Sequence, residues 1–96
     1  MTRVYYIYLM MNKSNTVIYT GITNNLLRRV YEHKHKLQGS FTARYKVTKL
    51  VYYETFNSPT SAIDREKQIK AGSRKRKEAL IDSINPGRED LFERFV

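Results

Sequence analysis

Two strand-forming runs joined by a very short turn constrain the fold of this chain more than any other feature. Residues 3–11 (RVYYIYLMM) and residues 16–21 (TVIYTG) are rich in aromatic and β-branched side chains, which predicts two strands. Residues 12–15 (NKSN) form a turn cluster between them. A parallel pair needs a connection of about a dozen residues or more, so these strands must form an antiparallel hairpin.

A helix and a third strand are predicted after the hairpin. Thr23 or Asn24 can cap a helix that runs over about residues 25–37. Residues 39–48 (GSFTARYKVT) form a basic loop, and residues 49–56 (KLVYYETF) have the composition of a strand.

Two further helices follow. Ser58 and Pro59 are typical of a helix start, and Gly72 ends that helix. Ser73 caps another helix, which extends to about Ile84 and stops at the residues NPG. A short turn of helix is expected to dock Leu91, Phe92 and Phe95. The element order β-β-α-β-α-α predicts an α+β fold with helices flanking a small sheet.

The composition predicts one soluble domain over residues 1–96 with an acidic tail at about 85–96. The absence of cysteine excludes disulfides, thiol chemistry and cysteine zinc sites. The longest apolar run, residues 4–11, is too short to span a bilayer and lacks signal-peptide flanks, so we expect a cytoplasmic protein.

The charge is unevenly distributed and indicates a polyanionic partner. Residues 1–77 carry sixteen Lys and Arg against four Asp and Glu, whereas residues 78–96 carry two against five. A basic body of this kind is typical of nucleic-acid binding, although the charge could serve solubility alone. No clean basic amphipathic helix indicates a membrane surface, and no protein partner can be inferred.

The hairpin brings two tyrosines close together. If its turn centres on residues 13–15, Tyr8 lies opposite or nearly opposite Tyr19, on the same face of the sheet. Such a pair is often cross-strand aromatic packing and nothing more.

The helix after the hairpin separates two neighbouring arginines. At about 100° per residue, Leu26, Val30 and Leu37 define the inward stripe, which also contains His33. Arg29 lies at the border of the stripe, whereas Arg28 and His35 point away. Arg29 could bind a phosphate, and His33 could accept or relay a proton. Alternatively, Arg29 extends its charged end to solvent and His33 forms an ordinary hydrogen bond. The two histidines do not converge into a metal site.

A carboxylate lies on the buried face of the next helix. Ala62, Ile63 and Ile69 mark that face, and Glu66 lies near its middle. Burying an unpaired carboxylate costs several kcal/mol, so Glu66 either pairs with a basic residue or binds a divalent cation. Together with Tyr8, Tyr19, Arg29 and His33, it supplies the components of phosphodiester hydrolysis. The sequence has no phosphate-binding glycine loop and no Ser-His-Asp pattern.

These residues resemble the GIY-YIG nuclease superfamily. The pairs YIY (Tyr6 to Tyr8) and YTG (Tyr19 to Gly21) look like its signature, and Arg29, His33 and Glu66 follow at the expected places. The chain resembles the small single-domain bacterial members over nearly its full length, including an NP…DL ending over residues 84–91.

The resemblance implies a metal-dependent endonuclease with a three-stranded antiparallel sheet flanked by helices. Glu66 would hold Mg²⁺ or Mn²⁺, and Arg29 would bind the scissile phosphate. Tyr8 would act as general base on the attacking water or deliver its proton onward, Tyr19 would orient the water or the phosphate, and His33 would assist proton transfer. An unperturbed tyrosine is a poor base at neutral pH, so Tyr8 would need a nearby cation.

Two supporting positions also follow from the resemblance. Gly21 would permit the tight turn into the helix, and Asn85 matches a late asparagine that supports the site. The chain departs from the family pattern at Tyr6, where the family has Gly, and at Thr20, where it usually has Ile or Val. Tyr6 shares a strand face with Tyr8 and could crowd the site, whereas Thr20 faces the other way.

The expected substrate is DNA rather than RNA, with structured nucleic acid as a further candidate. Backbone contacts are expected from a basic loop and a basic helix start, which comprise Arg44, Lys46, Lys49, Arg74, Lys75, Arg76 and Lys77. The alternative is a non-catalytic nucleic-acid-binding module that retains the nuclease fold.

Overall fold

The hairpin and the helices form in the predicted order. The computed structural model describes residues 3–35 and 44–95, and its fold is α+β. Its elements are β1 (Tyr5–Met11), β2 (Ile18–Thr23), α1 (Leu26–Lys34), β3 (Lys49–Phe56), α3 (Pro59–Ala71), α4 (Arg74–Ile84) and the 3-10 helix η1 (Leu91–Phe95). None of the helices within the described ranges is long and apolar enough to cross a membrane.

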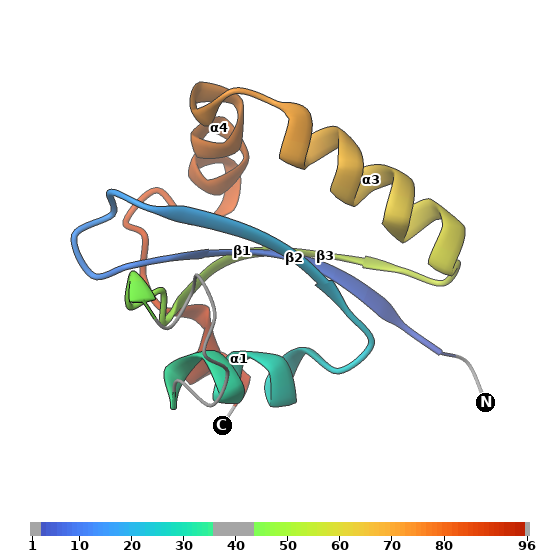
Figure 1. Cartoon of the computed structure of the whole chain (residues 1–96), viewed down its shortest axis with the longest axis horizontal. Helices are drawn as coiled ribbons and strands as arrows, with labels where there is room; N and C mark the ends of the chain where they lie inside the picture. The colour runs from blue at the N-terminus through green and yellow to red at the C-terminus, as the bar shows by residue number, and fades with distance from the viewer. Residues whose placement is uncertain (1–2, 36–43, 96) are drawn as a thin grey trace.

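The central strand of the sheet is β1, and both of its neighbours run antiparallel to it in the order β2-β1-β3. The helices divide between the two faces of this sheet (Figure 1). α3 and α4 cover one face, and α1 lies below the other together with η1. This arrangement confirms the predicted antiparallel sheet flanked by helices, and it leaves β2 as an edge strand.

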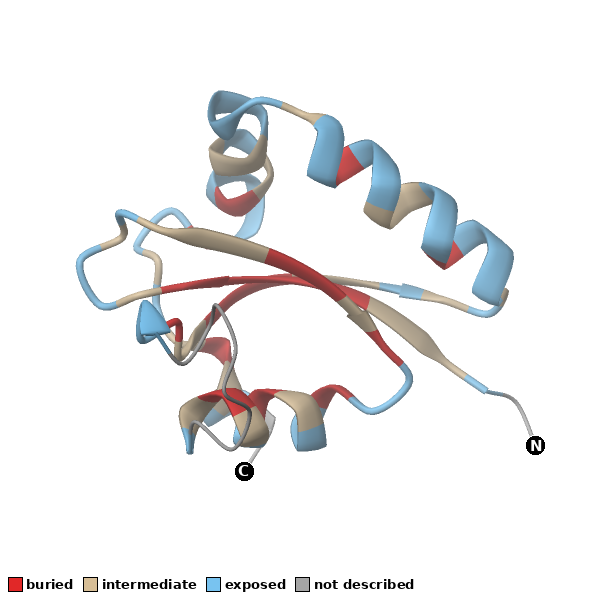
Figure 2. Ribbon diagram, viewed as in Figure 1, coloured by how far each residue is buried: buried red, intermediate tan, exposed pale blue. Residues whose placement is uncertain are grey.

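Alternation along β1 builds two separate cores. Ile7, Leu9 and Met11 pack against α3 and α4, whereas Tyr8 and Met10 pack toward α1. All five side chains are at most 1% exposed, because the strand is covered on both faces. Figure 2 accordingly shows the buried residues concentrated along the middle of the sheet, with the outer sides of α3 and α4 exposed.

A β-bulge in β3 changes which side chains face α1. Leu9 lies opposite Tyr52 and Met10 lies opposite Leu50, so Val51 is the extra residue. Val51 and Tyr52 consequently both belong to the core below α3 and α4, and Leu50 and Tyr53 both belong to the core beside α1.

The first helix begins later than predicted. β2 extends to Thr23, whose hydroxyl accepts a hydrogen bond from the Asn25 N–H at 3.1 Å, and Asn25 is the residue that caps α1. The prediction of Thr23 or Asn24 as the cap was therefore wrong by one or two positions. α1 ends at Lys34 with His35 as its C-cap, so the predicted end at about Leu37 was too late. The loop residues 39–43 lie outside the described residues. The caps Ser58 and Ser73 are confirmed.

The hairpin register places Gly21, rather than Tyr19, opposite Tyr8. Tyr19 lies opposite Met10, two residues along the same face, because the connection between the strands is centred between Ser14 and Asn15. Gly21 lies within β2 and not in a turn into the helix. A Cβ atom there would come within 2.8 Å of Cε1 of Tyr8 and closer still to Cζ and Oη, so only glycine leaves room for this ring.

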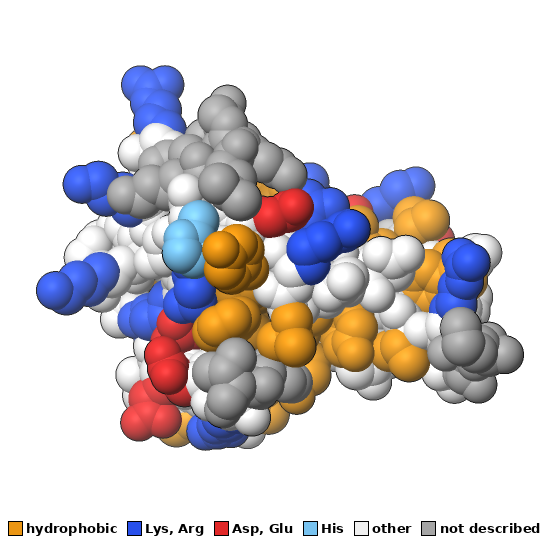
Figure 3. Space-filling view, turned by 90° about the horizontal axis from the view of Figure 1, so that it is seen from below, with side chains coloured by type: hydrophobic (Ala, Val, Ile, Leu, Met, Phe, Trp, Pro, Cys, Tyr) orange, Lys and Arg blue, Asp and Glu red, His pale blue; other side chains and the backbone are white. Residues whose placement is uncertain are grey.

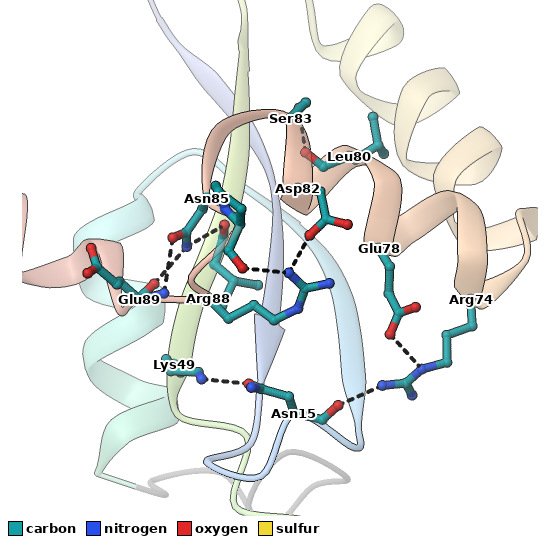
Figure 4. Close-up of polar contacts among 12 residues, drawn as sticks. Asn15, Lys49, Arg74, Glu78, Leu80, Asp82, Ser83, Asn85, Arg88 and Glu89 are labelled. Atoms are coloured by element: carbon teal, nitrogen blue, oxygen red, sulfur yellow. Dashed lines mark hydrogen bonds and ion pairs between the residues drawn. The ribbon is translucent and has the colours of Figure 1, made fainter.

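The hairpin turn is held in place by its own Asn12 and by residues of two distant elements. The side-chain oxygen of Asn12 accepts hydrogen bonds from the N–H groups of Thr16 and Val17. Arg74, at the start of α4, donates to the carbonyl oxygens of Asn15 and Thr16 at 2.7 and 2.6 Å (Figure 4). The Lys49 ammonium donates to Oδ1 of Asn15 at 2.6 Å.

Asn85 closes the connection between α4 and η1. Its amide nitrogen donates to the carbonyl oxygens of Val51 and Glu89 at 3.1 and 2.8 Å, and its oxygen accepts from the Glu89 N–H at 3.0 Å (Figure 4). The side chain is 3% exposed. These hydrogen bonds fix the loop after α4 against β3.

Asp90 extends these contacts toward α1, and the hydrogen bonds of Asn85 and Asp90 together are called the clasp. One carboxylate oxygen accepts from the N–H groups of Leu50 and Phe92 at 3.1 Å each, and the other pairs with Lys34. Lys34 also donates to the Thr48 carbonyl at 3.0 Å. The predicted docking of the tail is confirmed for Leu91, which is 2% exposed, and for Phe92, whereas the side chain of Phe95 lies outside the description.

We predict that Gly21→Ala destabilises the protein by about 1–3 kcal/mol, because the added methyl group overlaps the Tyr8 ring. Urea unfolding followed by circular dichroism measures the effect. Gly87→Ala is the matched control, because its Cβ would meet only Glu89 Cγ at 3.7 Å, an ordinary contact. Equal stability of the two variants would contradict the close approach at Gly21.

We predict that Asn85→Ala lowers the free energy of unfolding by about 2 kcal/mol, since it leaves the carbonyl of Val51 and the backbone of Glu89 without these partners. The exposed Asn57→Ala is the control and should change stability by less than about 0.5 kcal/mol. Thermal unfolding with equal midpoints for both variants would show that the clasp contributes nothing.

Candidate active site

Three aromatic rings meet between the hairpin and α1. Tyr8 lies on β1, Tyr19 on β2 and His33 on α1. The ring centroids are 6.1 Å apart for the two tyrosines, 5.8 Å for Tyr8 and His33, and 5.3 Å for Tyr19 and His33. The Tyr8 hydroxyl lies 3.1 Å from Nε2 of His33, which is a hydrogen bond. The structure therefore brings together these three predicted site residues.

Arg29 lies beside this cluster and has unused hydrogen-bonding capacity. Its side chain is 31% exposed, yet its Nε atom is buried and has no hydrogen-bond partner within the described chain. The nearest acidic group is Glu32, with Oε1 at 3.8 Å from this Nε. Arg28 is exposed, as predicted. A guanidinium in a partly open position suits an oxyanion such as phosphate, because its planar fork of donors matches a pair of phosphate oxygens.

The pKa values of Tyr8 and His33 reflect the burial of their side chains. Burial raises the pKa of Tyr8 well above its ordinary value, the neighbouring Tyr19 raises this pKa further, and the Arg29 charge lowers it only in part. Burial also lowers the pKa of His33, and so does the Arg29 charge, against a smaller opposite effect from Glu32. The phenol is thus kept protonated and the imidazole is kept neutral near pH 7. The nearby cation Arg29 does lower the pKa of Tyr8, but burial outweighs its effect.

Glu66 lies apart from the aromatic cluster. It is on α3, between the buried residues Ala62 and Ile69, and α3 packs on the face of the sheet opposite to α1 (Figure 1). The carboxylate side chain is 15% exposed and pairs with Lys70 at 3.6 Å. The prediction that it points toward the sheet agrees with this burial, whereas Ile63, which was assigned to the same face, is 43% exposed.

The donor groups fit a magnesium ion only in part. Within residues 3–35 and 44–95, no three His, Asp or Glu side chains gather where they could hold a metal ion. The Lys70 ion pair is longer than a hydrogen bond, so the Glu66 oxygens retain capacity for a cation. Mg²⁺ is commonly held by one or two carboxylates, with water and substrate phosphate completing its coordination. Glu66 is thus suited by chemistry to such a site.

The two departures from the family signature have different surroundings. Thr20 is 5% exposed and lies opposite Leu9, on the α3 side of the sheet, as predicted. Tyr6 lies on the same face as Tyr8, and its ring centroid is 6.3 Å from that of Tyr53. Tyr53 was not predicted near the site, although it lies directly opposite Tyr8. The alternation along β3 was a signal, but the strand order and the bulge were needed to place it.

The predicted backbone contacts fall into two groups. Lys49 and Arg74 hold the hairpin turn, and their polar atoms are engaged within the protein. The exposed cations are Arg44, Lys46, Lys75 and Arg76, and Lys77 is partly exposed. Arg44 lies over the Tyr45 ring at 5.6 Å. The first two precede β3, and the other three lie at the start of α4.

A second polar network lies on the α3 side of the sheet. Arg65 donates to both carboxylate oxygens of Glu54 at 3.0 Å, and the Tyr52 hydroxyl donates to the same carboxylate. Burial and then this hydrogen bond raise the pKa of Tyr52 to about 12. The network ties α3 to β3. The acidic Glu54 within a largely apolar strand was the signal that sequence reasoning missed.

The chain matches a known family model over most of its length. Residues 4–79 match the GIY-YIG catalytic domain. This range contains the hairpin, α1, β3 and α3, and therefore every member of the predicted catalytic set.

Individual relatives match as much as 95% of the chain. A UPF0213 protein of Clostridium perfringens is 37% identical over 91 residues, 95% of this chain and 96% of that protein. A UPF0213 protein of Natronomonas pharaonis is 38% identical over 77 residues, 80% of this chain and 89% of that protein. The NMR structure of a UPF0213 protein from Bacillus halodurans is similar, with a TM-score of 0.57 and 28% identity over 88% of this chain and 90% of that one. The chain therefore belongs to the GIY-YIG family, within its group of small single-domain UPF0213 proteins from bacteria and archaea.

Proposed function

We propose that the protein is a metal-dependent endonuclease that hydrolyses phosphodiester bonds in DNA or structured nucleic acid. The observation that carries this proposal is the cluster of Tyr8, Tyr19 and His33 beside Arg29, whose buried Nε lacks a partner in the described chain. The family match and the net charge of +9 support a nucleic-acid substrate.

Arg29 is assigned to the scissile phosphate. The phosphate oxygens would accept hydrogen bonds from the partly exposed guanidinium, and the fixed positive charge would stabilise the charge that develops in the transition state. Binding an anion there would also offset the Arg29 charge, which is one of the causes of the low His33 pKa. Substrate binding would therefore make His33 a better proton acceptor.

The aromatic cluster provides a route for the proton of the attacking water. Tyr8 is 1% exposed whereas Tyr19 is partly exposed, so we assign contact with the water to Tyr19. Tyr19 takes a proton from the water and gives its own hydroxyl proton to Tyr8, and Tyr8 gives its hydroxyl proton to Nε2 of His33, so both phenols end protonated and the imidazole gains one proton. A neutral imidazole can accept this proton, whereas a tyrosine whose pKa is raised is a poor base on its own.

Glu66 is assigned to Mg²⁺ or Mn²⁺. When bound, the ion would stabilise the negative charge on the phosphate and on the leaving oxygen. The edge strand β2 is the element that both parts of the site share, because Tyr19 of β2 contacts His33 of α1 on one face and α3 packs on β2 from the other. A strand of nucleic acid along the free edge of β2 would meet residues from both faces.

A non-catalytic nucleic-acid-binding module is the second candidate. The observations that favour it are the buried, protonated Tyr8 and the position of Glu66 across the sheet from α1. Nucleic-acid binding that is steeply salt-dependent, unaffected by Glu66→Gln and unaccompanied by metal-dependent cleavage would support this alternative.

We predict that Arg29→Ala lowers the rate of metal-dependent cleavage by about 10²–10³-fold, the usual effect of removing a positioned donor to a developing charge. Arg28→Ala is the matched control, because Arg28 is adjacent, exposed and directed away from the cluster. Glu66→Gln should abolish cleavage in both Mg²⁺ and Mn²⁺. Gel assays on DNA and RNA substrates measure these rates, and cleavage that survives both Arg29→Ala and Glu66→Gln would place the chemistry elsewhere.

We predict that the pKa of His33 lies below its ordinary value in the free protein and rises when inorganic phosphate is added. Because the imidazole of the unfolded chain binds the proton more readily, the contribution of neutral His33 to the free energy of unfolding is fully present above pH about 6.5. It is lost as the pH falls toward the pKa of His33 in the folded protein. NMR titration and urea unfolding at several pH values test this, with His33→Gln as control. A pH dependence that is unchanged in His33→Gln would assign the effect to another group.

A further inference from the structure

We propose that Tyr6 and Tyr53 form a stacking surface for unpaired nucleobases beside the catalytic cluster. If so, the substrate of the proposed nuclease is nucleic acid with unpaired nucleotides next to the scissile bond. The claim about substrate rests on the proposed function, whereas the claim about stacking can be tested without it.

The register of the sheet places four tyrosines on one face, in a bent row that runs from β2 over β1 to β3 and returns to β1. Tyr53 lies directly opposite Tyr8, and Tyr6 is two residues before Tyr8 on the same face. The ring centroids of Tyr6 and Tyr53 are 6.3 Å apart with 59° between the planes, and on the other side those of Tyr8 and Tyr19 are 6.1 Å apart. The row Tyr19, Tyr8, Tyr53 and Tyr6 thus continues from the proposed chemistry across the sheet.

The two outer tyrosines of this row remain accessible. α1 and η1 lie beneath one part of the sheet, and the beginning of β1 extends beyond them (Figure 1). Tyr6 and Tyr53 are both partly exposed, in contrast to Tyr8 at 1%. The view from this side shows a band of hydrophobic and tyrosine side chains across the face, with lysine and arginine side chains along it (Figure 3).

Each of these tyrosines lines a hollow of the surface that also contains polar groups. Tyr6 lines one of about 210 Å³ with Asn24, Asn25, Leu26 and Leu27. Tyr53 lines another of about 380 Å³ with Ile84, Leu91 and Arg94. Aromatic faces beside an exposed amide and an exposed arginine provide stacking, hydrogen bonds to a base edge and attraction to a phosphate.

The occupant that fits these features is an unpaired nucleotide. In a duplex the faces of the bases are stacked on each other, so a flat aromatic surface gains contact only where bases are unpaired. Tyrosines on an open sheet face are a common means of binding single strands. The net charge of +9 favours a polyanion over a neutral peptide on the same surface.

Binding without divalent metal separates this inference from catalysis. Fluorescence anisotropy in EDTA compares three probes of equal length, namely a single strand, a blunt duplex and a duplex with a single-stranded overhang. Tyr6→Leu and Tyr53→Leu should weaken binding of the single strand and the overhang about fivefold or more, and leave the blunt duplex unchanged. Tyr6→Phe should retain wild-type binding, because it keeps the ring. Tyr31→Leu is the control, since Tyr31 is 50% exposed on α1 and outside the row.

Several outcomes would overturn the inference. Equal weakening for all three probes would indicate a non-specific contact, and unchanged binding in both leucine variants would exclude stacking. A change of oligomeric state in Tyr6→Leu, with nucleic-acid binding retained, would make this face an interface between copies of the chain. Cleavage without preference for unpaired nucleotides would refute the inference and leave the proposed function intact. Tyrosine-dependent binding of unpaired strands without any cleavage would support the stacking surface and contradict the proposed function.

Discussion

The packing of the Tyr8 ring over Gly21 is the contact on which the site depends. The ring occupies the volume that a side chain on β2 would fill, and this position directs the hydroxyl to His33. The edge strand β2 thereby contributes Gly21, which has no side chain, and the phenol of Tyr19 two residues earlier. The same contact buries Tyr8 so completely that its acidity falls instead of rising. The geometry of the cluster and the raised pKa of Tyr8 therefore share a cause.

The sheet distributes the proposed chemistry over its two faces. Aromatic and cationic groups lie on the α1 side, and the candidate metal ligand lies on α3. Each helix is fixed by its own polar contacts, Asp90 with Lys34 for α1 and Glu54 with Arg65 for α3. Both anchors reach β3 or the backbone at its start, so β3 is the common support of the two halves. The strand that carries no predicted catalytic residue is thus the one that aligns those that do.

Much of this could be predicted from the sequence because local signals agreed with the fold. The turn between residues 12 and 15, the serine caps and the apolar periodicity gave the element order and the inward position of His33. The strand order, the bulge at Val51 and the partner of Gly21 depend on pairings between distant residues, which no local pattern encodes. For the same reason Glu66 could be assigned to a buried helix face but not to a face of the sheet. Arg74 and Lys49 appeared as generic surface cations, because their carbonyl and amide partners lie more than thirty residues away.

The clasp at Asp90 has a consequence for how the protein is made. α1 and the hairpin are complete once the first third of the chain has been synthesised, yet the carboxylate that binds Lys34 and the Leu50 N–H belongs to residue 90. On the ribosome, this anchor can form only after almost every residue described has emerged from the exit tunnel. The helix that carries Arg29 and His33 therefore gains this support only after residue 90 has emerged. A nascent chain that has not reached that point lacks the contact that secures its candidate active site.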